Sequence, residues 1–190
     1  MDFATAESSK TNRPANSSDT EIEMSTTKPA TPRRSARKQP DALRMLKDDH
    51  DKVKALFEKF QNAKRDDKKK GEIAQTICKE LTVHTKLEEE IFYPAVRAAI
   101  GDEDVMNEAL VEHASAKDLV GEIEKMSPDE DMFDAKVTVL GEFVNHHIRE
   151  EQNQMFPQVR KTDLDLNALA DTMRARKQQL TGEKAEEAAA

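Results

Sequence analysis

Six ionisable side chains fall on stripes that are otherwise apolar at helical spacing: His50, His84, Glu88, His113, His147 and Glu151. The two histidines on consecutive stripes are 34 residues apart in both cases, from His50 to His84 and from His113 to His147. A glutamate follows the second histidine of each pair by four residues, which places both side chains on one helix face. The equal spacing predicts that all six groups meet at one level of a helical assembly.

An internal repeat supports this interpretation. An offset of 63 residues superimposes His50 on His113, His84 on His147, Glu88 on Glu151, Pro94 on Pro157, Val96 on Val159 and Arg97 on Arg160. The central part of the chain is therefore predicted to contain two copies of one helical hairpin.

Polar groups at these positions need a partner, because an unpaired ionisable side chain in a bundle core costs several kcal/mol. Imidazole and carboxylate groups suit divalent transition metals, and a carboxylate can bridge two ions. A single zinc ion would use about four of the six groups, whereas two iron ions use all six and keep open positions. We therefore expect two iron ions, with zinc or manganese less favoured, and as ligands His50, His84, Glu88, His113, His147 and Glu151.

Other side chains near the stripes are interpreted as structural. His146 and Glu150 repeat the His-x-x-x-Glu spacing one residue out of register, but the 63-residue offset selects His147, so His146, Glu150, Glu89 and Glu90 are expected on the flank or surface. Cys78 is expected to be a small core residue and Tyr93 a packing residue. The eight methionines are expected to fill gaps in the core.

The composition favours helices. The chain has 190 residues, of which 36% are hydrophobic, 36% charged and 4% aromatic, with five glycines. Apolar periodicity and its breaks predict four helices. The first covers about 41–65, the second carries Ile73 and ends near Gly101, the third runs from Asp102 to Ser127, and the fourth carries Phe133 and ends at about Arg160. The predicted fold is all-α: an antiparallel up-down-up-down four-helix bundle over 41–160.

The two ends are predicted to differ from the bundle. Residues 1–40 are rich in Ser, Thr, Pro, Lys and Arg and are expected to form a disordered tail. Its basic cluster between Lys28 and Lys38 could touch acidic surfaces or nucleic acid, but a solvated linker is favoured. Residues 161–190 are expected to form an amphipathic helix with a frayed end, packed on the bundle or, as a homodimer, on a second copy.

Charge and cysteine content bound the possible partners. The net charge of −8 argues against a dedicated nucleic-acid binder, and the apolar runs are too short to cross a membrane. The first residues lack the basic and apolar regions of a secretory signal, and Cys78 is the sole cysteine. We expect a cytoplasmic protein.

Four segments together resemble the hemerythrin-like HHE cation-binding domain: DDHDKVKALF, HTKLEEEIFYP, VEHASAKDLV and HHIREEQNQMFP. The resemblance covers roughly residues 41–160 and implies a non-heme di-iron centre with the same six ligands, Glu88 and Glu151 being the natural bridges. Ferritin-like proteins carry Glu-x-x-His pairs instead, which these segments lack.

This chain departs from the oxygen-carrying hemerythrins at two positions. Those proteins have a further histidine one turn after that of the third helix and an aspartate on the fourth, where this chain has Lys117 and Glu151. The missing fifth imidazole argues against a simple oxygen carrier. Lys117 and the equivalent Lys54 are expected to extend to solvent.

The expected function is therefore a di-iron protein that binds, senses or reacts with a small ligand such as O₂, NO or peroxide. A peroxide-decomposing, catalase-like enzyme is an alternative, because that reaction needs little beyond the metals. A metal-free helical interaction protein is the alternative from another class.

Overall fold

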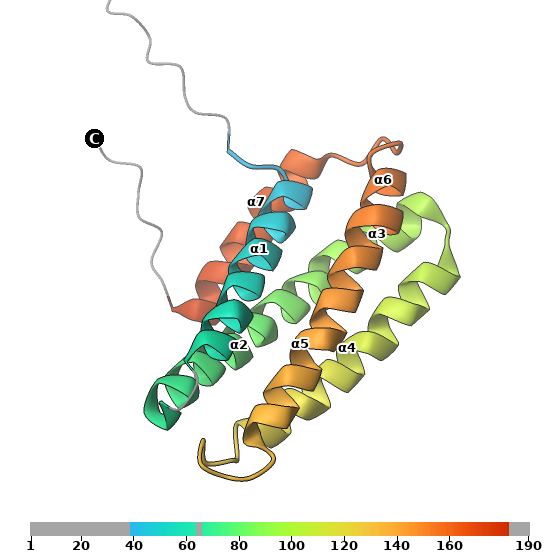
Figure 1. Cartoon of the computed structure of the whole chain (residues 1–190). Helices are drawn as coiled ribbons and strands as arrows, with labels where there is room; N and C mark the ends of the chain where they lie inside the picture. Colours follow the sequence, from blue (N-terminus) through green and yellow to red (C-terminus); the bar gives the residue numbers. More distant parts are fainter. Residues whose placement is uncertain (1–38, 64–65, 183–190) are drawn as a thin grey trace, which may run out of the picture. The chain divides into compact units, whose positions relative to one another are not determined.

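The computed structural model describes residues 39–63 and 66–182. Every regular element within these ranges is helical, and none is a strand (Figure 1). The predicted tail over 1–40 lies outside the described residues except for its last two, and the predicted frayed end lies outside them from residue 183. No helix in the described part is long and apolar enough to span a membrane.

The first repeat consists of α1 (Ala42–Asn62), α2 (Asp67–Leu87), η1 (Glu88–Phe92) and α3 (Tyr93–Ile100). Asp41 begins α1 by accepting a hydrogen bond from the Arg44 backbone N–H at 2.8 Å, and Asp66 caps α2 in the same way. Gly101 ends α3 in the left-handed conformation, with φ of 66°, which glycine adopts without steric cost. These boundaries agree with the predicted first and second helices to within a few residues.

The second repeat consists of α4 (Glu103–Ile123), α5 (Phe133–Glu150), η2 (Glu151–Met155) and α6 (Phe156–Val159). Asp102, where the sequence predicted this helix to start, caps α4 by accepting from the Val105 backbone N–H at 3.4 Å. Its elements therefore follow the same order as those of the first repeat.

A wide π-helical turn, which apolar spacing did not predict, interrupts the long helix of each repeat. The turns η1 and η2 start at Glu88 and Glu151, 63 residues apart, and a proline is the second residue after the end of each turn. The Tyr93 N–H donates to the Glu88 carbonyl five residues back, instead of four. Proline supplies no N–H and crowds the preceding turn, so the ladder widens at this point.

The four long helices form a ring of contacts: α1 packs on α2 and α5, and α4 packs on α5 and α2. The core between them is divided into two apolar clusters, one around Leu46, Phe92 and Met155, and the other around Phe57, Ile77 and Leu140. The buried polar residues of the centre lie on the same helices between the members of these clusters.

Helix α7 (Leu166–Thr181) packs mainly on α1, α2 and η1 (Figure 1). Asp165 caps it, and Ala170 and Met173 are fully buried against the first cluster. Lys177 makes an ion pair with Asp49 at 2.5 Å. The C-terminal amphipathic helix thus packs within its own chain, while the predicted homodimer through it stays a prediction.

Candidate metal centre

All six residues singled out by spacing are buried and converge in the core. The exposed fraction is 1% for His50, 0% for Glu88 and at most 7% for the remaining four. They come from α1, α2, η1, α4, α5 and η2, so each repeat contributes two histidines and one glutamate. The structure therefore brings together every residue of the predicted ligand set.

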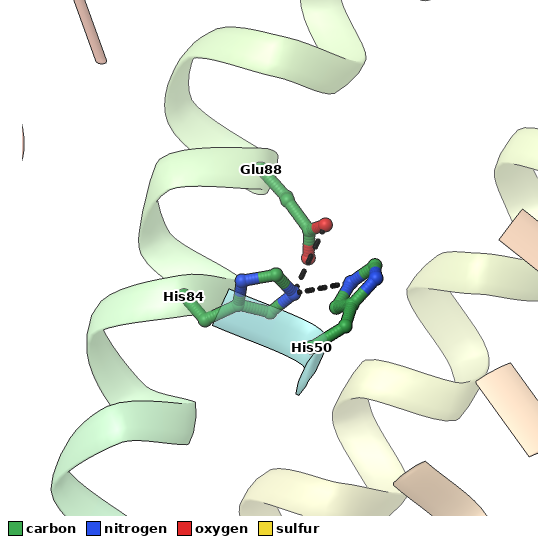
Figure 2. A group of neighbouring side chains, drawn as sticks. All are labelled: His50, His84 and Glu88. Carbon is green, nitrogen blue, oxygen red and sulfur yellow. Dashed lines mark hydrogen bonds and ion pairs between the residues drawn. The ribbon is translucent and has the colours of Figure 1, made fainter. Parts of the chain in front are cut away.

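The histidines meet in two pairs through their Nε2 atoms. The Nε2 atoms of His50 and His84 are 3.0 Å apart, and those of His113 and His147 are 3.2 Å apart. The Glu88 carboxylate lies between the pairs, with one oxygen 3.1 Å from His84 Nε2 and the other 3.3 Å from His113 Nε2. Two clusters of potential ligand atoms result, and both contain Glu88; Figure 2 shows the one with His50 and His84.

Glu151 is less central than Glu88. One of its oxygens is 3.2 Å from His50 Nε2, but it belongs to neither three-residue cluster. The repeat therefore places two glutamates at equivalent positions, of which Glu88 alone contacts both histidine pairs.

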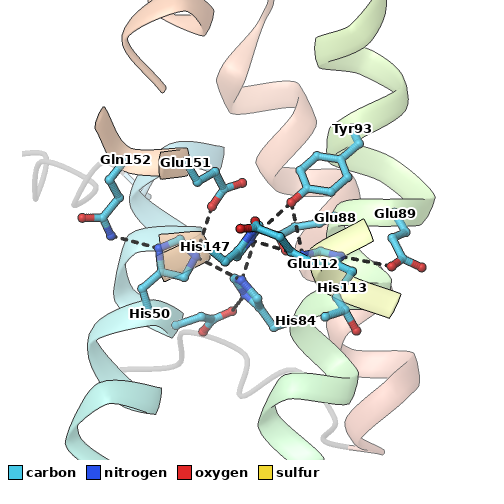
Figure 3. Close-up of polar contacts among 12 residues, drawn as sticks. His50, His84, Glu88, Glu89, Tyr93, Glu112, His113, His147, Glu151 and Gln152 are labelled. Carbon is cyan, nitrogen blue, oxygen red and sulfur yellow. Dashed lines mark hydrogen bonds and ion pairs between the residues drawn. The ribbon is translucent and has the colours of Figure 1, made fainter. Parts of the chain in front are cut away.

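A second layer of polar side chains faces the outer Nδ1 atoms (Figure 3). Glu89 lies 3.0 Å from His113 Nδ1, Glu112 lies 2.9 Å from His147 Nδ1, and the Gln152 amide nitrogen lies 2.9 Å from His50 Nδ1. Asp49 approaches His84 Nδ1 only to 3.8 Å. Sequence reasoning placed Glu89 on the flank and did not single out the other three. The repeat held the signal, because the 63-residue offset pairs Asp49 with Glu112, and Glu89 with Gln152.

Tyr93 is a functional candidate that sequence reasoning interpreted as packing alone. Its hydroxyl is 3.3 Å from His113 Nε2 and 3.5 Å from His147 Nε2 (Figure 3). The wide turn η1 explains the difference, because it changes the phase of the helix and regular α-helical spacing then misplaces the residues after it. Burial, together with the nearby carboxylates of Glu88 and Glu151, raises the pKa of this hydroxyl well above its usual value.

The remaining candidates lie where the sequence placed them. His146 is exposed and contacts Glu150 and Glu112, at 3.3 and 3.4 Å. Lys117 extends to a half-exposed position, where it pairs with Glu89. Cys78 is buried in the second apolar cluster, and burial raises its thiol pKa to about 11. His146, Lys117 and Cys78 therefore lie outside the buried cluster of six residues.

Burial and mutual charge interactions shift the pKa of both glutamates and of His84. Burial opposes the charge of Glu88, but His84 and His113 outweigh it and hold its pKa well below the usual range. Burial lowers the pKa of His84, yet the Glu88 and Asp49 carboxylates more than compensate and raise it to about 10. Burial and the neighbouring Glu88 raise the pKa of Glu151. A proton on His84 thus balances the charge of Glu88 in the metal-free centre.

The donor set fits metal ions. Both oxygens of Glu88 and of Glu151, and Nδ1 of His84, are buried without a hydrogen-bond partner. Unsatisfied buried carboxylates are costly, whereas convergent imidazole and carboxylate groups are a typical transition-metal environment. These features define a class of helical proteins that hold cations between core histidines and carboxylates supplied by four helices.

Comparisons with known proteins agree with that class. The family model described as Hemerythrin HHE cation binding domain matches residues 41–159. The chain belongs to this family. A crystal structure of a hemerythrin HHE cation-binding domain-containing protein from Mycobacterium kansasii is similar, with a TM-score of 0.65 and 25% identity, covering 76% of this chain and 89% of that one.

A curated relative is the DNA nickase of Nostoc sp. strain PCC 7120. It is 36% identical over 120 residues, which are 63% of this chain. The matched segment spans only 33% of the nickase.

Proposed function

We propose that this chain is a non-heme di-iron protein that binds, senses or reacts with a small ligand: O₂, NO or peroxide. One observation carries the proposal. Four imidazole Nε2 atoms and two buried carboxylates without hydrogen-bond partners converge at one place in the core.

The ligand assignment follows the two clusters. His50 and His84 would hold one ion, and His113 and His147 the other, with Glu88 shared between them. Glu151 would be the second bridging carboxylate, from its equivalent place in the repeat. We also propose that the four long helices alternate in direction. In support, α1 and α4 begin in the first apolar cluster and end in the second, and α2 and α5 begin in the second.

Iron bound here would supply a reversible change of oxidation state and open coordination positions for the ligand. The chain itself supplies a small cavity that reaches all four histidines and whose remaining walls are mostly apolar, formed by Val53, Leu81, Ala116, Phe143, Val144 and Ile148. Such walls exclude water and admit a small, weakly polar molecule. Tyr93 keeps its proton because of its raised pKa, so its hydroxyl can donate a hydrogen bond.

Binding or sensing is favoured over catalysis, because the chemistry of the described site lies almost wholly in the six proposed ligands. A peroxide-decomposing enzyme is the second candidate, and the Tyr93 hydroxyl favours it by offering a hydrogen-bond donor beside the His113 and His147 pair. A metal-free interaction protein is the third. It predicts that His84→Ala and His147→Ala leave stability unchanged or raise it, whereas a metal site predicts lost metal and lower stability.

Metal content per chain tests the proposal. Full-length protein, expressed with iron available and purified without chelator, is expected to contain about two irons by elemental analysis, the count expected of the two ligand clusters. Zinc alone at that ratio would preserve the site but contradict the redox role. If no metal is bound, even after anaerobic reconstitution with ferrous iron, the di-iron proposal is wrong and the metal-free interaction protein is favoured.

A further inference from the structure

We propose that the two metal positions are unequal in affinity and that the His113–His147 position fills before the His50–His84 position. The inference rests on the proposed two-metal centre and concerns the side chains behind the ligands. These side chains differ between the repeats, although the six proposed ligands match.

Carboxylates lie behind both histidines of the His113–His147 position. Glu89 is 3.0 Å from His113 Nδ1, and Glu112 is 2.9 Å from His147 Nδ1. An imidazole that binds a metal through Nε2 carries its proton on Nδ1 and donates it to such a group. A carboxylate acceptor fixes the ring orientation and raises the basicity of the ligand. Both histidines of this position are therefore held for metal binding.

The His50–His84 position has weaker support at the equivalent places. Gln152, at the place equivalent to Glu89, puts its neutral amide nitrogen 2.9 Å from His50 Nδ1, and this nitrogen is a donor where Glu89 supplies a carboxylate acceptor. Asp49, which replaces Glu112, is 3.8 Å from His84 Nδ1, too far for a hydrogen bond. Lys177 of α7 also holds Asp49 by an ion pair at 2.5 Å. Each exchange between the repeats weakens the acceptor behind this pair.

The local charge is also more negative around the His113–His147 position than around the His50–His84 position. The His113–His147 position has two carboxylates, Glu89 and Glu112, of which Lys117 pairs with Glu89 only. The ion pairs that the structure describes for Glu112 are all with histidines. Around the other position, the charge of Asp49 is matched by Lys177, and Gln152 has none. The uncompensated negative charge at the His113–His147 position favours a divalent cation.

A titration of the full-length, metal-stripped chain with Co²⁺ under anaerobic conditions tests the proposal. The wild-type protein should bind two ions in two separable steps. Calorimetry and the visible absorption of the bound cobalt monitor both steps. His147→Ala should abolish the tighter step and retain the weaker one, and His84→Ala should do the reverse. Loss of an outer acceptor typically lowers metal affinity about 10–100-fold. Glu89→Gln should therefore weaken the tighter step by that factor.

Gln152→Glu is the reciprocal variant and should strengthen the weaker step. It keeps the proposal testable if Glu89→Gln folds poorly by circular dichroism. Glu90→Gln is the matched control, because Glu90 is exposed and pairs with Arg176, and it should change neither step.

Two equal affinities in the wild type, or a tighter step unchanged in Glu89→Gln and a weaker step unchanged in Gln152→Glu, would overturn the proposal while the two-metal centre stands. Absence of any cobalt binding would instead overturn the proposed function.

Discussion

The two repeats present equivalent groups to the centre but differ in what covers their outer faces. The first repeat lies under α7, which buries Met173 and pairs Lys177 with Asp49. The second repeat carries exposed apolar side chains on α4 and α5, including Val111 at 67% and Phe143 at 45%. The six proposed ligands thus match between the repeats, whereas the residues around them differ with the neighbours they contact.

The glutamates at the start of the two wide turns give the most severe test of this equivalence. Glu88 contacts both histidine pairs and Glu151 contacts one, so Glu88→Gln should cost both metals and Glu151→Gln one at most. We expect affinity losses larger than the roughly 100-fold that outer-layer changes cause. Metal content by elemental analysis measures this.

Glu150→Gln is the matched control, because Glu150 pairs with the exposed His146. Equal metal loss in Glu88→Gln and Glu151→Gln would show that the glutamates contribute alike.

The pH dependence of the metal-free protein tests His84 of the first repeat. The pKa of His84 is raised from 6.5 to about 10, so its stabilising contribution is complete below pH 6.5 and is lost as the pH rises through about 10. The Tm should fall over this window, by about 2–4 °C for each kcal/mol lost. His84→Ala should flatten the profile. Metal affinity should rise over the same window, because binding displaces the proton.

A thermal scan series from pH 6 to pH 10, on protein with chelator present, makes the measurement. A profile that is the same in wild type and His84→Ala would mean that another group controls this dependence.

The smallest expected effect concerns the aromatic residues one step after each wide turn. Tyr93 directs its hydroxyl to His113 and His147, whereas its equivalent Phe156 stacks on His50 with ring centroids 6.1 Å apart. Tyr93→Phe should preserve the fold and metal content but weaken a bound ligand that accepts a hydrogen bond, by about 1 kcal/mol.

The affinity of the ferric protein for azide, determined from the absorption of the azide complex, measures the effect. Phe156→Tyr is the reciprocal variant in the other repeat. Unchanged azide affinity in Tyr93→Phe would assign the tyrosine to packing.

The sequence predicted the helices and all six residues that converge at the centre, because a histidine or glutamate on an apolar stripe is conspicuous. Glu112 and Gln152 were not found, since a polar side chain at a half-exposed position does not contrast with its surroundings. Tyr93 was misinterpreted because apolar periodicity assumes a regular helix, and the wide turn breaks that assumption. The division into three segments and the cytoplasmic location remain predictions.

The recurrence of a wide turn at Glu88 and at Glu151 bears on the history of the chain. A helix of this shape that occurs twice, 63 residues apart, is the pattern expected from duplication of an ancestral hairpin that already possessed it. Two identical copies of such an ancestor, related by a twofold axis, would assemble a complete centre with two metal positions made equal by symmetry. A single chain that holds both hairpins has no such constraint, so its equivalent positions can carry different residues, as Glu89 and Gln152 do.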